Sequence, residues 1–117
     1  MTHNEIDAMQ AGPEMDRMVA EKVMGWRPPD CDHGPGRMCG LCWPSDPLPR
    51  YSTDLNAAVE ACGARPFTLR RGRARYWARV QYGDQPHYES RLVRTRSASA
   101  ETSALALCRA LLKAVSP

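Results

Sequence analysis

Residues 27–50 constrain the fold more than any other part of this sequence, because proline and glycine recur throughout them. Proline lacks a backbone N–H and fixes φ, so neither a helix nor a central strand tolerates this density. A connection of more than twenty residues without secondary structure needs something else to organise it. The segment, called the connector below, therefore separates a helical region at 4–24 from a second region at 51–117.

Four side chains of the kinds that bind metal ions lie within the connector. They are Cys31, His33, Cys39 and Cys42. Cysteine and histidine at short spacings supply the tetrahedral ligands of structural zinc, and the C-x-x-C of Cys39 and Cys42 is a frequent half-site. The chain has five cysteines, an odd number that argues against a closed disulfide framework. We therefore predict one structural Zn²⁺ on these four residues, organising the connector in place of an apolar core.

Other interpretations of the cluster stay open. The C-x-H pair formed by Cys31 and His33 is tight, and His87 or His3 is the alternative fourth ligand. Without metal, the thiols would be free or would form a reversible disulfide. A thioredoxin-like redox centre requires a helix directly after the C-x-x-C, which Pro44 prevents. A catalytic zinc would need an open coordination position and a nearby general base, so the pattern favours a structural ion.

Helices are predicted on both sides of the connector. In the first region Asn4 is a candidate N-cap, and Pro13 suits the first position of a second helix. An apolar stripe of helical period follows, made of Met15, Met18, Val19 and Val23, and Gly25 is a candidate C-cap. After the connector, Ser52 or Thr53 would begin a helix that ends at Gly63. Its expected apolar face consists of Leu55, Ala58, Val59 and Cys62.

Alternating apolar and polar residues then predict three antiparallel strands. The first includes Phe67 and Leu69, the second spans 74–82 and the third 87–95. A last helix is expected over 100–115, capped by Thr102 or Ser99, with Leu105, Cys108, Leu112 and Val115 on its buried face. We expect one α+β domain over 1–117, in which helices cover one or both faces of a three-stranded antiparallel sheet.

Charge is distributed unevenly along the chain. The first fifty residues hold eight acidic and five basic side chains, whereas the rest hold eleven basic and five acidic ones. Nine arginines lie between positions 65 and 96, namely Arg65, Arg70, Arg71, Arg73, Arg75, Arg79, Arg91, Arg94 and Arg96. Such a concentration of one basic residue type indicates an arginine-rich surface on the predicted sheet.

The second strand places Arg75, Trp77 and Arg79 on one face, with Arg70, Arg71 and Arg73 at the preceding turn. Guanidinium groups match phosphate oxygens and an indole can stack on a base, so these six residues are candidate contacts for nucleic acid or an acidic partner. The competing interpretation buries Trp77 under a helix and pairs the arginines with Glu60, Glu89 and the acidic first half. The element order is similar to that of double-stranded RNA-binding domains, but the lysine cluster at the start of their last helix is missing.

Other classes of function find little support in the sequence. No apolar run has the length of a membrane span, and the N-terminus lacks the basic and apolar parts of a secretory signal. We therefore expect a cytoplasmic protein. No phosphate-binding loop, metalloprotease helix or nucleophile elbow occurs, so we expect neither an enzyme nor a small-molecule substrate.

Three stretches resemble the phage ABA-sandwich domain family, small proteins of phages and prophages. They are MDRMVAEKVMGW at 15–26, YSTDLNAAVEA at 51–61 and ETSALALCRALLKAV at 101–115. The resemblance implies an α–β–α sandwich around an antiparallel sheet, and it implies no activity. The cysteine cluster departs from the family pattern, so the predicted zinc depends on this chain's own residues.

Together these features predict a small phage or prophage accessory protein of the bacterial cytoplasm. It would be a non-catalytic, zinc-stabilised binding module that acts on a host or phage protein, for example as an inhibitor of host defence of the anti-CRISPR type. The alternative is a nucleic-acid-binding protein that uses the arginine-rich hairpin at 65–96.

Overall fold

The computed structural model describes residues 2–25, 49–82 and 94–115. Three helical segments come first: α1 (His3–Ala8), α2 (Pro13–Met18) and its π-helical continuation η1 (Val19–Val23). Helix α3 (Leu55–Cys62) precedes strands β1 (Phe67–Arg71), β2 (Tyr76–Tyr82) and β3 (Arg94–Ala100), and helix α4 (Ser103–Val115) follows them. The α+β class and the order of elements predicted from the sequence are confirmed.

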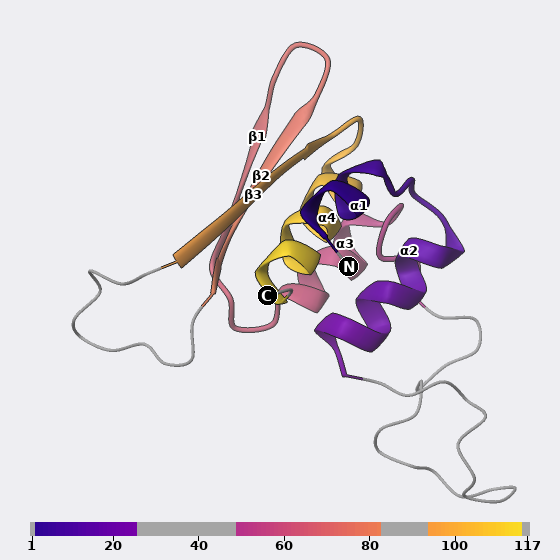
Figure 1. Ribbon diagram of the computed structural model, residues 1–117. Helices are drawn as coiled ribbons and strands as arrows, with labels where there is room; N and C mark the ends of the chain where they lie inside the picture. The colour runs from indigo at the N-terminus through magenta and orange to yellow at the C-terminus, as the bar shows by residue number, and fades with distance from the viewer. Residues whose placement is uncertain (1, 26–48, 83–93, 116–117) are drawn as a thin grey trace, which may run out of the picture.

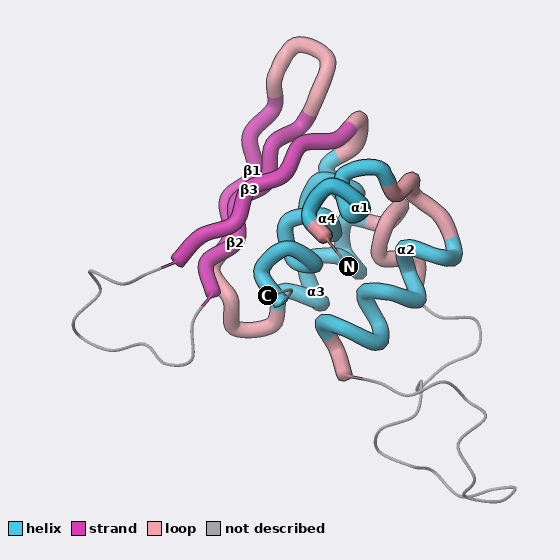
Figure 2. Tube along the Cα trace, viewed as in Figure 1, coloured by secondary structure: helices cyan, strands magenta, loops and turns pink. Residues whose placement is uncertain are grey.

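The sheet is antiparallel in the order β1-β2-β3, so β2 is central and the other two strands form its edges. Leu69 lies opposite Ala78, and Ala78 lies opposite Ala98. Because successive side chains alternate between faces, this row belongs to the inner face, which packs against α4. The neighbouring rows belong to the opposite face. Figures 1 and 2 show every described helix on the inner side of the sheet.

Helix α4 lies between the sheet and the other helices (Figure 1). Ten of its thirteen residues are buried, including Leu107 and Leu111, which the sequence analysis did not assign to the core. The prediction of a single buried face was therefore too narrow, since α4 packs against the sheet on one side and against α1, η1 and α3 on the other. A helix that is apolar nearly all round is typical of such a central position.

The helical caps differ in detail from the prediction. Thr2, rather than Asn4, accepts a hydrogen bond from the Glu5 backbone N–H at the start of α1. Asp54 caps α3 in place of Ser52 or Thr53. Ser52 is fully buried and donates its hydroxyl to the Asp16 carboxylate at 2.7 Å. This buried bond joins α2 to the chain that enters α3, which explains why Ser52 is not available as a cap.

Helix α3 is also rotated relative to the prediction. Leu55 and Val59 are each 37% exposed, whereas Ala57 and Ala61 are buried together with Ala58 and Cys62. Small side chains allow α3 to approach α4 closely, so the alanines occupy the interface although leucine and valine are more hydrophobic. The predicted burial of Cys62 is confirmed.

The third strand ends later than predicted, and the last helix begins later. The described part of the strand spans Arg94–Ala100, whereas the prediction ended at residue 95 and its positions 87–93 lie outside the described residues. The helix begins at Ser103 instead of residue 100. Ala98 and Ala100 are buried in the inner face opposite Ala78 and Tyr76, so they extend the sheet. Thr102 then caps α4 by accepting a hydrogen bond from the Leu105 N–H at 3.3 Å, and this predicted cap is confirmed.

Candidate nucleic-acid interface

The strand register defines the face of the sheet that points away from α4, called the outer face below. Its members follow from the pairs Thr68–Arg79–Ser97, Arg70–Trp77–Ser99 and Gln81–Thr95. No helix of the described part of the chain lies on this face (Figure 2). Sheets of this kind are stable with one face solvated when the other face packs on a core.

Among the described residues of the outer face, Trp77 is the one large apolar side chain, and 52% of its surface is exposed. Its cross-strand neighbours are Arg70 and Ser99. The indole leans toward the β1–β2 turn: a Cβ on Gly72 would lie 3.5 Å from Trp77 Nε1. The interpretation in which a helix buries Trp77 is therefore wrong for the described structure.

The five arginines of the candidate set are exposed. Arg70 and Arg79 project from the outer face, while Arg71, Arg73 and Arg75 surround the β1–β2 turn. None of the five forms an ion pair with another described residue. The predicted pairing with Glu60 is therefore not found, and Glu89 lies outside the described residues. Within the described ranges, these guanidinium groups therefore have no acidic partner.

Two shallow hollows meet at Trp77. The first, of about 560 Å³, is lined by outer-face and turn residues including Arg70, Gly72 and Arg79. The second, of about 570 Å³, lies over β3 and is lined by Arg75, Ser99, Asp7, Arg109 and Lys113. Trp77 and Ser97 line both hollows. The exposed arginines Arg70, Arg71 and Arg79 line the first hollow together with the indole.

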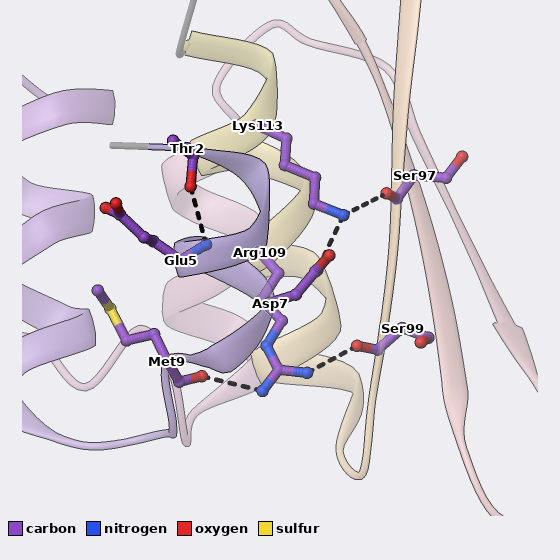
Figure 3. A network of polar contacts seen from close by, with 8 residues as sticks. All are labelled: Thr2, Glu5, Asp7, Met9, Ser97, Ser99, Arg109 and Lys113. Carbon is purple, nitrogen blue, oxygen red and sulfur yellow. Dashed lines mark hydrogen bonds and ion pairs between the residues drawn. The ribbon is translucent and has the colours of Figure 1, made fainter.

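Side chains of α4 form a network of polar contacts along β3, the edge strand opposite β1 (Figure 3). Arg109 donates one guanidinium N–H to the Ser99 carbonyl at 2.8 Å and another to the Met9 carbonyl at 2.9 Å. Burial lowers the pKa of Arg109, which is only 5% exposed, and nearby Asp7 opposes that shift. Lys113 pairs with Asp7 at 2.8 Å and donates to the Ser97 carbonyl at 3.3 Å. The sequence analysis missed this network, although a lone arginine within an apolar helix is a signal for it.

The predicted zinc ligands Cys31, His33, Cys39 and Cys42 lie outside the described residues, as does His87. His3 is described, on α1, and its Nε2 is buried without a hydrogen-bond partner among the described residues. Within the described ranges no three side chains of His, Cys, Asp or Glu come together as a metal site. The zinc therefore stays a prediction from the sequence.

The two described cysteines have the environment of core residues. Burial raises the pKa of Cys62 to about 11, and burial also raises the pKa of Cys108. Cys108 donates its thiol proton to the Tyr51 carbonyl, with Sγ 3.1 Å from the oxygen. A thiol that stays protonated is a poor nucleophile and a poor metal ligand, so both act as packing residues.

The chain matches no protein-family model, no curated protein and no solved structure. None of the helices in the described ranges has the length and apolar character needed to cross a bilayer.

Proposed function

We propose that this protein is a non-catalytic binding module whose outer face binds single-stranded nucleic acid. The observation that supports this most directly is the half-exposed Trp77 among arginines that form no ion pairs with other described residues. Phosphates would contact Arg70, Arg79 and the arginines of the turn, and a base would stack on the indole. Both kinds of contact are widespread among proteins that bind single strands without sequence preference.

A single strand suits this face better than a duplex does. Paired bases are already stacked on each other, so an indole on a broad, open face reaches a base plane only when that base is unpaired. The positions around Trp77 carry small hydroxyl side chains at Thr68, Ser97 and Ser99, which leave room for a base and can form hydrogen bonds.

The structural Zn²⁺ and the phage association are part of the same proposal. The zinc is supported by the ligand types and spacing of the connector, with Cys31, Cys39, Cys42 and His33 as its ligands. An accessory role in a phage or prophage, including inhibition of host defence, is supported by the family resemblance at 15–26, 51–61 and 101–115. A host or phage protein is a second candidate partner.

Fluorescence anisotropy tests this function. The probe is a labelled single strand of mixed sequence, about 16 nucleotides long, which is the upper range for one small binding domain. Replacing Trp77 with alanine should weaken binding about 10-fold to 100-fold, the usual value of one base–aromatic stack. Arg70→Ala and Arg79→Ala should each make the negative slope of log K against log salt shallower by about 0.7. Arg50→Ala is the matched control, because Arg50 is exposed on the segment before α3.

Three results would contradict the proposal. These are no binding at low salt, equal affinity for the matched duplex, and a Trp77→Ala variant that binds as tightly as the parent protein. Circular dichroism of each variant excludes unfolding as the cause. Because the arginine side chains are exposed, we expect changes in the unfolding free energy within about 0.5 kcal/mol for the three arginine variants.

A further inference from the structure

Among the described residues, nothing pairs with the outer edge of strand β1, called the free edge below. Two hydrogen bonds lie at the ends of the β1–β2 ladder, from the Gly72 N–H to the Arg75 carbonyl and from the Gln81 N–H to the Pro66 carbonyl. They show which residues of β1 direct their backbone N–H and C=O groups toward β2. Backbone groups alternate in direction along a strand, so Thr68 and Arg70 point toward β2. The N–H and C=O groups of Phe67, Leu69 and Arg71 therefore point outward, and no described residue pairs with them.

At the opposite edge of the sheet, on β3, side chains of α4 bond to the outward carbonyls. The outward carbonyls of β3 at Ser97 and Ser99 accept hydrogen bonds from Lys113 and Arg109 of α4 (Figure 3). Capping an edge strand with cationic side chains prevents another strand from pairing there. The contrast leaves β1 as the edge at which a further strand can add.

The side chains beside the free edge specify what kind of strand fits. On the inner side Phe67 and Leu69 are only partly buried against the core, so apolar surface extends to the edge. On the outer side lie Thr68 and the exposed Arg70, whereas Arg71, at the end of the strand, follows Leu69 on the inner side. An added strand would place alternate residues on these two sides, one apolar and one cationic.

We propose that the β1 edge docks an extended segment of a partner protein in which acidic residues alternate with apolar ones. Its backbone would pair with Phe67, Leu69 and Arg71, its apolar side chains would cover Phe67 and Leu69, and its carboxylates would approach Arg70. Addition of a strand to a sheet edge is a common mode of peptide recognition. A second copy of this chain fits less well, because it would bring its own arginines next to these. The inference goes beyond nucleic-acid binding, since it uses backbone groups that the outer face does not.

The probe is an acetylated and amidated heptapeptide of alternating glutamate and valine, titrated into the full protein by isothermal calorimetry. Two control peptides separate the contributions: alternating lysine and valine, and the same glutamates and valines in two blocks. We expect binding of the first peptide only. Equal binding of the block peptide, or none of the alternating one, would overturn the proposal.

The decisive variant is Leu69→Pro, which removes an outward N–H and leaves the β1–β2 ladder intact, as edge strands tolerate. Compared with Leu69→Ala, which shortens the same side chain but keeps the N–H, it should bind the peptide at least about fivefold more weakly. Equal affinities of the two variants would contradict strand addition. Both should retain oligonucleotide binding, so failure of this inference is distinguishable from failure of the proposed function.

Amide hydrogen exchange gives a second readout on the unmodified protein, should Leu69→Pro not fold. In the free protein the Leu69 and Arg71 amides should exchange faster than the paired amide of Arg70. The alternating peptide should slow the first two selectively. Unchanged exchange at saturating peptide would overturn the proposal, as would sedimentation of the free protein as a dimer that the peptide does not dissociate.

Discussion

Three buried groups that can lose a proton lie close together where α3, α4 and the entry to α3 meet. Burial raises the pKa of Tyr51 to about 12 and that of Cys62 to about 11, and it raises the pKa of Cys108 in the same direction. The nearby Asp16 carboxylate adds to the shifts of Tyr51 and Cys108. All three side chains therefore stay neutral at physiological pH.

These pKa shifts predict a loss of stability at alkaline pH. In the unfolded chain the thiols ionise near pH 9.0, whereas the folded chain keeps their protons to higher pH. Their contribution is complete below pH 9 and declines as pH rises toward the folded pKa, since the unfolded state then binds fewer protons. Between pH 9 and its folded-state pKa, each thiol should lower the unfolding free energy by about 1.4 kcal/mol per pH unit.

Urea unfolding between pH 8 and pH 11 measures this slope. Cys62→Ala removes one of the groups, so its unfolding free energy should fall less steeply with pH than that of the parent protein. Parallel curves for the two proteins would show that Cys62 ionises equally in both states, contrary to its burial.

Among the elements, helix α4 depends on one polar side chain within an otherwise apolar surface. Arg109 joins α4 to β3 through the Ser99 carbonyl and to the end of α1 through the Met9 carbonyl. Its planar guanidinium serves both acceptors at once, which a lysine ammonium cannot do with the same geometry. Arg109 thus holds the first helix, the last helix and the edge strand together.

Replacing Arg109 with methionine should destabilise the protein by about 2–4 kcal/mol, because two carbonyl acceptors lose charged donors. Arg109→Lys should recover part of this loss. Lys113→Met is the matched control: its ion pair with Asp7 is partly exposed, so we expect a loss below about 1 kcal/mol. Chemical unfolding gives all three values. Equal effects of Arg109→Met and Lys113→Met would contradict the role of Arg109 in joining α1, α4 and β3.

At the scale of the whole molecule, direct hydrogen bonds join the two parts of the chain that lie before and after the connector. Ser52 lies just after the connector, and its N–H and hydroxyl both bond to the Asp16 carboxylate of α2, at 2.8 Å and 2.7 Å. Its hydroxyl also accepts from the Gly12 N–H at 2.9 Å. The core therefore anchors the chain that leaves the connector, whatever organises the connector itself.

Metal analysis of the purified protein tests the predicted zinc. We expect about one zinc per chain, released by chelators together with protection of residues 28–48 from proteolysis. Cys39→Ser and Cys42→Ser should lose the metal, whereas Cys62→Ser should retain it because Cys62 lies in the core. Metal-free protein with the same proteolysis pattern would contradict a zinc-organised connector.

Much of the architecture follows from local patterns in the sequence. Alternation predicted β1 and β2, helical period predicted the stripe at Met15 and Val19, and Gly63 marked the end of α3. Such patterns depend on residues only a few positions apart, so they can be recognised without knowledge of the fold. The arginines and Trp77 were likewise identified as candidates from composition and spacing. Element boundaries such as the end of β3 were less well predicted, because Ala98 and Ala100 suit either a strand or a helix.

Alone, the sequence determined which side chains share a face, because that depends only on the period of the local backbone. Only the tertiary structure decided which faces are covered. It left Trp77 exposed on the outer face, placed α4 between two layers, and gave Arg109 its acceptors on distant segments. It also left the outer edge of β1 without a partner strand in the described part of the chain. Burial of this kind depends on packing between segments far apart in the chain, and no short stretch of sequence contains that information.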